Sequence, residues 1–233
     1  MKLIVKSKSS SLHHKLIAFK NDINGTYENI KKDLKEDLLM SLLKEQGYIC
    51  AYCMKKINQD NSTIEHIIGQ KYKDGNIDLG KENELKYENL LAVCLGNSCK
   101  ELNCDKSRSK YQEKRPLYVN PLENRIMTNI KFTNNGLIFY EDFIEIDKIK
   151  EFKNHNSHLE SENIKYDIQK ILNLNCNDLK EKRKVLIEAL KKYTNNWSDK
   201  EKIRKKLQIY ELKYNSEYEE LCQVAIYFLS KKL

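Results

Sequence analysis

The chain has 233 residues, of which 40% are hydrophobic and 33% are charged, and its formal net charge is +8 at pH 7. This length suffices for one well-packed core, and the hydrophobic fraction excludes a mostly disordered chain. No apolar run approaches the roughly 18 residues that a membrane-spanning helix needs. The N-terminal MKLIVKSKSSS also has too short an apolar core for a signal peptide. We therefore expect a cytoplasmic protein that does not associate with membranes.

Positive charge gathers in three stretches of the chain. Residues 1–20 carry five lysines and no acid, and residues 180–206 carry eleven Lys or Arg against four acids. The third stretch contains Lys106, Arg108, Lys110, Lys114 and Arg115. Clustered positive charge suits a polyanion such as nucleic acid, because released counterions favour association. We expect the third stretch to contact phosphate, whereas solvated helix surface explains the C-terminal stretch equally well.

Hydrophobic periodicity predicts a helix before the cysteine-rich part of the chain. Between residues 27 and 46 an apolar side chain recurs every four positions, and Gly47 is a suitable stop. Residues 63–68 have the character of a strand, residues 69–87 of a long polar loop and residues 89–93 of a short apolar segment.

Further along the chain, residues 130–139 alternate apolar and polar side chains around Asn135-Gly136, which predicts a β-hairpin. Beyond residue 158 the apolar spacing is helical throughout. The sequence thus predicts an α+β fold with a β-hairpin and a mostly helical C-terminal part. We divide it into an N-terminal lead-in with a helix, a cysteine-containing core, a linker with the hairpin, and a helical region. Their predicted bounds are residues 1–47, 48–116, 117–157 and 158–233.

Five of the seven cysteines lie between residues 50 and 104. A CxxC pair lets two thiolates reach one ion from a tight turn, and a tetrahedral zinc site needs two further ligands. A second cysteine group follows CAYC after about forty residues, which indicates structural zinc rather than a redox site. The predicted ligands are Cys50, Cys53, Cys94 and Cys104. Cys99 is then surplus, although it could replace Cys94 or Cys104.

A Glu65-His66 pair stands between the two halves of this predicted zinc site, at the end of the predicted strand. A neutral histidine can accept a proton from water near neutral pH, so it is a suitable general base. The neighbouring carboxylate could hold a hard divalent cation through oxygen. Because adjacent strand residues point to opposite faces, the pair needs a bend in order to converge on one site.

The motifs CAYC, IEH, ENLLAVC and CDKSR, taken in this order, resemble those of the zinc-bearing HNH endonucleases. The segments EQGYICAYC and ILNLN, the latter followed by Leu and Arg, make the chain similar to HNH proteins of retron and Septu anti-phage systems. The resemblance implies a ββα-metal (His-Me finger) core, in which a hairpin and a helix grip one catalytic divalent ion beside a structural zinc knuckle.

Carried over to this sequence, the resemblance implies a role for each matched residue. His66 would be the general base, and Asn89 would hold the active-site loop and orient the histidine. Glu65 and Asp105 would be ligands of a catalytic Mg²⁺ or Mn²⁺ ion, although the wider class often has His or Asn at the position of Asp105. Lys106 and Arg108 would touch the phosphate backbone.

The resemblance also implies a partner, an ABC- or SMC-like ATPase, since proteins of this defence family typically act beside one. The sequence contains no Walker A motif of its own. The predicted C-terminal helices would form the docking surface for it. Two alternatives remain at this point: a non-catalytic zinc module that binds nucleic acid or a partner, and a stand-alone restriction or homing-type HNH enzyme. No motif in the sequence distinguishes DNA from RNA as the substrate.

Overall fold

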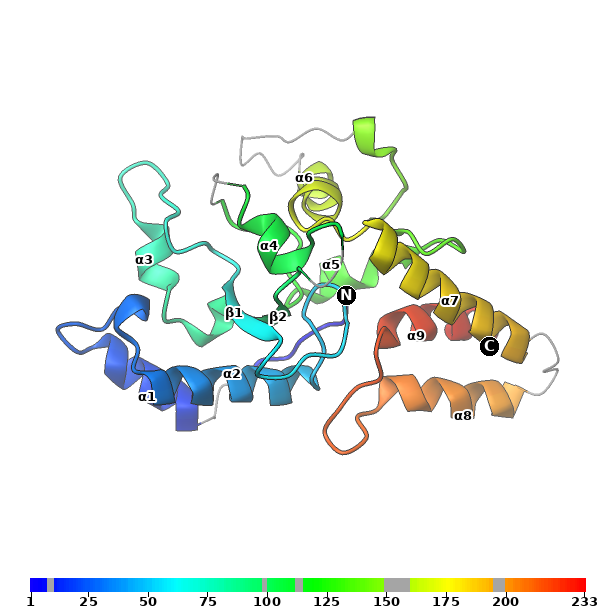
Figure 1. Ribbon diagram of the computed structural model, residues 1–233, viewed down its shortest axis with the longest axis horizontal. Coiled ribbons are helices and arrows are strands. Elements are labelled where there is room, and N and C mark those ends of the chain that lie inside the picture. The colour runs from blue at the N-terminus through cyan, green and yellow to red at the C-terminus, as the bar shows by residue number, and fades with distance from the viewer. Residues whose placement is uncertain (8–10, 98–99, 112–114, 149–159, 195–199) are drawn as a thin grey trace.

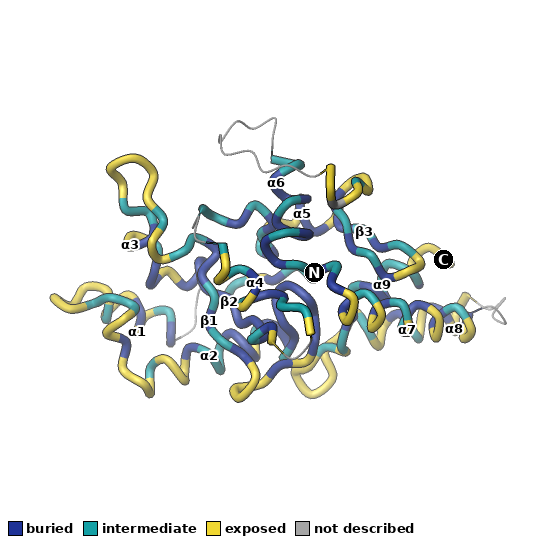
Figure 2. Tube along the Cα trace, turned by 45° about the horizontal axis from the view of Figure 1, so that its top comes forward, coloured by how far each residue is buried: buried dark blue, intermediate teal, exposed yellow. Residues whose placement is uncertain are grey.

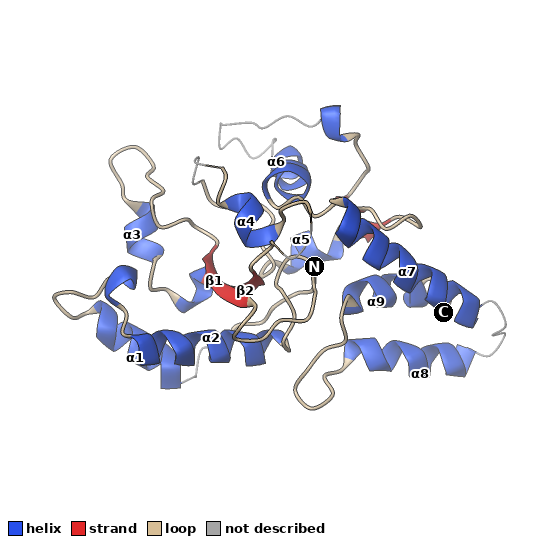
Figure 3. Ribbon diagram, viewed as in Figure 1, coloured by secondary structure: helices blue, strands red, loops and turns tan. Residues whose placement is uncertain are grey.

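The computed structural model describes residues 1–7, 11–97, 100–111, 115–148, 160–194 and 200–233. In this part of the chain, helices surround two small antiparallel sheets (Figures 1 and 3). The strands are β1 (Ser62–His66), β2 (Leu90–Cys94), β3 (Ile130–Phe132) and β4 (Ile138–Tyr140). The α-helices are α1 (Ser11–Lys20), α2 (Lys32–Gln46), α3 (Leu79–Asn83), α4 (Cys104–Arg108), α5 (Asn124–Thr128), α6 (Glu160–Tyr166), α7 (Asn177–Thr194), α8 (Lys200–Glu211) and α9 (Cys222–Ser230). Shorter helical turns are η1 (Tyr27–Asn29), η2 (Tyr87–Asn89), η3 (Ile146–Lys148) and the π-helical η5 (Asp167–Ile171).

Helix α2 confirms the predicted lead-in helix, although it begins at Lys32 because Tyr27–Asn29 forms the separate turn η1. It buries Leu38, Leu42 and Leu43 and ends at Gly47, as predicted. Gly47 has φ +64°, and a Cβ atom there would lie 2.5 Å from a ring carbon of Tyr218. Only glycine satisfies both conditions, so this residue can end the helix and turn the chain into the cysteine knuckle.

The central sheet pairs β1 with β2 in antiparallel register, which sets Glu65 opposite Leu91 and His66 opposite Leu90. Every residue of β2 is buried, and this strand contacts both α2 and α4. The buried segments gather around this centre, whereas the tips of the α1 and α3 loops are exposed (Figure 2). The connection between the two strands contains the short helix α3, which corrects the prediction of a continuous loop over residues 69–87. The Asp78 side chain begins this helix by accepting a hydrogen bond from the Lys81 amide.

The predicted hairpin and helical C-terminal part are both confirmed. Strands β3 and β4 flank the Asn135-Gly136 turn, in which the Thr133 amide donates to the Leu137 carbonyl at 3.0 Å. Helix α7 is tied to this turn because the buried Arg183 side chain donates to the carbonyl oxygen of Gly136 at 2.6 Å. Helices α7, α8 and α9 share a small apolar core of their own, made by Leu190, Ile203, Leu207, Ala225 and Leu229.

The C-terminal part of the chain returns to the cysteine knuckle. The Tyr218 amide donates to the carbonyl of Gly47, and the Leu221 amide donates to the carbonyl of Met54. These bonds join the helical region to the central core. Among the described residues, no helix is both long and apolar enough to cross a membrane.

Candidate metal centre and active site

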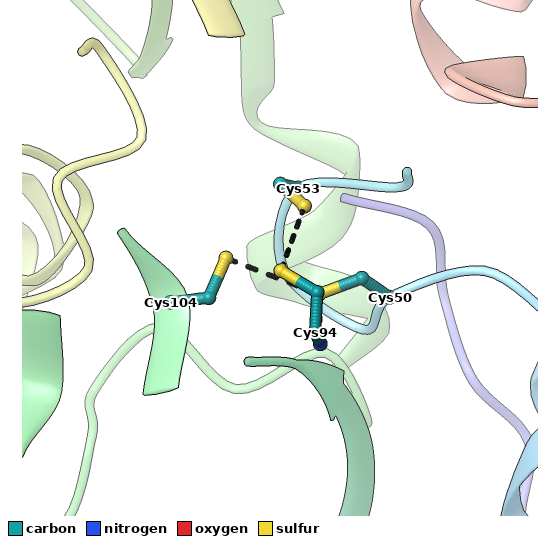
Figure 4. A group of neighbouring side chains, drawn as sticks. All are labelled: Cys50, Cys53, Cys94 and Cys104. Atoms are coloured by element: carbon teal, nitrogen blue, oxygen red, sulfur yellow. Dashed lines mark hydrogen bonds between the residues drawn. The ribbon is translucent and has the colours of Figure 1, made fainter. Parts of the chain in front are cut away.

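Four buried cysteines converge on one point beside the central sheet (Figure 4). Cys50 and Cys53 lie in the knuckle after α2, Cys94 ends β2, and Cys104 begins α4. Their Sγ atoms all lie within 4.8 Å of one another. The Cys50–Cys104 and Cys53–Cys94 sulfur pairs are 3.9 Å and 3.6 Å apart. These are the four cysteines selected from the sequence, whereas Cys99 lies outside the described residues.

The spacing of the sulfur atoms fits a tetrahedral zinc ion. A Zn–S bond is about 2.3 Å long, so the edge of a regular ZnS₄ tetrahedron measures about 3.8 Å. Burial alone would raise the pKa of the Cys50 thiol, but hydrogen bonds from the Cys104, Cys53 and Cys94 thiols hold it well below its ordinary value. Burial raises the pKa of the Cys104 thiol, so without a cation the buried set does not ionise as a whole. Zinc binds cysteine as thiolate and would supply the compensating positive charge. The four-cysteine cluster is therefore compatible with structural zinc.

His66 lies at the end of β1 and is 7% exposed. Its ring is nearly perpendicular to the Tyr27 ring, with the two ring centroids 4.4 Å apart. Its Nε2 atom is 3.0 Å from the carbonyl oxygen of Glu84. A carbonyl oxygen can only accept, so Nε2 carries the proton and Nδ1 keeps its lone pair in the neutral ring. Burial lowers the pKa of His66 to about 4, hence the ring is neutral at physiological pH. The geometry therefore suits a proton acceptor.

Asn89 fixes the turn that follows His66. Its side-chain amide donates to the carbonyl oxygens of Ile68 and Asn83, both at 3.1 Å, and its Oδ1 accepts from the Ile68 amide at 2.7 Å. Asn83 immediately precedes Glu84, whose carbonyl holds the His66 ring. The Asn89 side chain thus joins the loop after His66 to the segment whose carbonyl group orients the His66 ring.

Glu65 is partly buried and forms an ion pair with Arg108 at the end of α4. The Arg108 guanidinium also donates to the carbonyl oxygens of His66 and Ile67, at 2.5 Å and 2.9 Å. Burial raises the pKa of Glu65, the Arg108 charge opposes this shift, and the charge of Asp105 adds to it. Burial likewise raises the pKa of Asp105, which is half-buried on α4.

A pocket of about 290 Å³ brings these side chains together. Glu65, His66, Asp105 and Arg108 all line it, and the chain bends directly after His66, as convergence of the Glu-His pair requires. Within the described part of the chain, the four cysteines form the only group of three or more His, Cys, Asp or Glu side chains close enough to share one ion. Glu65 and Asp105 alone therefore do not complete a cation cage.

The pocket also contains two further basic residues, of which Arg115 belongs to the predicted phosphate-contacting stretch and Lys71 is not predicted from the sequence. Lys71 and Arg115 line it, and Arg115 donates to the buried Asp167 carboxylate at 2.7 Å. Lys71 lies in the polar connection between β1 and β2, where no motif marks it, whereas Arg115 belongs to the basic stretch after α4. Lys106 and Lys110 are exposed on or just after α4 and do not line this pocket.

Comparison with known proteins gives one informative relative. A search of family models finds no match to the chain. A candidate HNH endonuclease of retron Ec83 from Escherichia coli is 31% identical over 118 aligned residues, which cover 44% of this chain and 45% of that protein. The chain thus matches less than half the length of this relative. This similarity confirms the resemblance to retron HNH endonucleases that the cysteine and Glu-His motifs indicate.

Proposed function

We propose that this protein is a metal-dependent HNH endonuclease that hydrolyses phosphodiester bonds of nucleic acid. The observation that carries the proposal is His66, a neutral buried histidine with Nε2 held by a carbonyl, in a pocket shared with two carboxylates and three basic side chains. In this role, Nδ1 of His66 accepts the proton of the attacking water. Similarity to a protein named as an HNH endonuclease supports the same reaction.

Two different ions belong to this proposal. Cys50, Cys53, Cys94 and Cys104 would hold zinc, which stabilises the knuckle and the start of α4. Glu65 and Asp105 would contribute oxygen ligands to Mg²⁺ or Mn²⁺. When bound, such an ion neutralises charge at the scissile phosphate and stabilises the leaving oxygen.

The basic side chains around the pocket would place the substrate. Lys71 and Arg115 lie in the pocket itself, and the exposed Lys106 and Lys110 lie on the adjoining surface. Each contact of a lysine or arginine with phosphate releases counterions, so binding should weaken steeply as salt is added.

We further propose that the nuclease acts in an anti-phage complex with an ABC- or SMC-like ATPase, docked on the C-terminal helices. Val185 of α7 and Ile209 of α8 are 63% and 51% exposed, and Leu212 directly after α8 is 64% exposed. These side chains would add apolar contact area if a partner packs on the C-terminal helices. Val185→Asp and Leu212→Asp should abolish co-purification with the proposed ATPase partner, and retained co-purification would exclude these residues from the docking surface.

A non-catalytic zinc module is the second candidate, and one observation favours it. The Glu65 carboxylate is already paired with Arg108, so a divalent cation would compete with the guanidinium for it. The two candidates differ in a cleavage assay on plasmid DNA and on total tRNA, with and without Mg²⁺ or Mn²⁺ and with the ATPase present or absent. Divalent-dependent cutting identifies the nuclease, and the substrate that disappears identifies its class. Binding without cutting in every combination would favour the module.

A further inference from the structure

We propose that Arg108 is a positioning residue that couples the cysteine cluster to the catalytic turn, rather than a residue that binds phosphate. This inference rests on the proposed nuclease function for its consequence in catalysis. The contacts by which Arg108 holds the turn lie within the chain and do not depend on that function.

The guanidinium of Arg108 has three protein partners on the segment that carries the catalytic pair. It forms an ion pair with the Glu65 carboxylate and donates to the carbonyl oxygens of His66 and Ile67. The side chains of Arg108 and Glu65 are 13% and 12% exposed. A planar fork of donors can hold a carboxylate and two carbonyls at once, which a lysine ammonium cannot reproduce.

The other end of α4 belongs to the cysteine cluster. Cys104 is the first residue of this helix and Arg108 is the last, so one helical turn separates a sulfur of the cluster from the guanidinium at Glu65. Cys104 has φ +46°, which is uncommon for a residue with a side chain, and its amide donates to the carbonyl of Leu172 at 2.9 Å. Contacts around Cys104 therefore fix the position from which Arg108 reaches the turn.

The environment of Arg108 differs from that of its basic neighbours. Lys106 and Lys110 are exposed, as residues that meet a polyanion from solvent should be. Arg108 is directed inward, and withdrawing it to meet phosphate would leave Glu65 buried without its partner. The arrangement therefore favours an internal role.

Arg108→Lys is the informative variant, because it keeps the charge and removes the fork. We expect amide hydrogen exchange at Ile67 and Ile68, whose amides bond to Asn89, to become about 10-fold faster or more as the turn opens locally. The turnover rate at saturating substrate should fall about 100-fold, since small misplacements of reacting groups have effects of that size. Substrate affinity, its salt dependence and zinc content should not change.

Arg125→Lys on α5 makes the same substitution in an exposed ion pair with Glu160, away from the pocket, and is the matched control. It should leave the exchange rates of both amides and the turnover rate unchanged. Unchanged exchange at Ile67 and Ile68 in Arg108→Lys would overturn the inference, as would a weaker salt dependence of substrate binding with normal turnover. If the wild-type protein cuts no substrate, the proposed function fails, while the exchange measurement still decides whether Arg108 positions the turn. Zinc content and thermal unfolding, measured on every variant, show that each protein is folded.

Discussion

The Nε2 atom of His66 lies 3.0 Å from the carbonyl oxygen of Glu84, and this contact assigns the proton to Nε2 of a buried, neutral ring. Because burial lowers the pKa of His66 from 6.5 to about 4, the unfolded chain binds a proton that the folded chain excludes between these values. The contribution of His66 to stability is thus complete above about pH 6.5 and is lost as the pH falls toward 4.

We therefore predict that acid destabilises the protein through His66, by up to about 3 kcal/mol across this interval. Urea unfolding at pH 7.5, 6 and 5, without added Mg²⁺, measures the effect. His66→Gln should show a flatter dependence on pH than the wild type does. If the unfolding free energies of the two proteins depend equally on pH, burial does not lower the pKa of His66.

The cysteine cluster gives a second prediction. Cys50→Ala should reduce zinc content and thermal stability together, because the free energy of zinc binding contributes directly to folding. Cys222 is equally buried but lies outside the cluster, so Cys222→Ala is the matched control. It should keep its zinc and lose only the packing of a small side chain. Full zinc content and an unchanged Tm in Cys50→Ala would remove Cys50 from the metal site.

Asn89 should matter both for stability and for activity. Its side chain makes three hydrogen bonds to backbone groups, so Asn89→Ala should cost about 3 kcal/mol of unfolding free energy. The turnover rate should fall as well, since the loop after His66 loses its anchor. Asn83→Ala removes a single side-chain bond, to the Leu79 carbonyl, and should cost about 1 kcal/mol. A loss in Asn89→Ala no larger than that of Asn83→Ala would contradict this role.

Tyr52, between the two cysteines of the knuckle, is 1% exposed, and its hydroxyl has no hydrogen-bond partner among the described residues. A buried polar group without a partner is destabilising, so Tyr52→Phe should stabilise the fold by about 1 kcal/mol. Chemical denaturation of the two proteins tests this prediction. A lower stability of Tyr52→Phe would mean that the hydroxyl binds a group such as an internal water.

Several elements of the fold could be predicted from local patterns in the sequence. The lead-in helix, its end at Gly47, the hairpin at Asn135-Gly136 and the C-terminal helices follow from periodicity and turn chemistry. The short helix α3 was missed because five residues are too few to display a helical period. The cysteines that meet were selected from their spacing in the chain, and the structure brings those four together.

The environment of Arg108 could not be predicted in the same way. Its place in a basic stretch indicated phosphate contact, whereas its partner Glu65 lies 43 residues earlier in the chain. Only the tertiary arrangement of α4 against the end of β1 reveals the pair. The same is true of Glu84, which holds the His66 ring from 18 residues away through its backbone carbonyl, a group common to all residues.

The most direct test of the nuclease assignment compares the cleavage rates of the wild-type protein, His66→Ala and His14→Ala with Mg²⁺ or Mn²⁺. His14 is exposed on α1 and is the matched control. We predict divalent-dependent cutting by the wild type and by His14→Ala, with a rate about 10³-fold lower in His66→Ala at equal zinc content. A His66→Ala protein that cuts as fast as the wild type would show that His66 is not the general base.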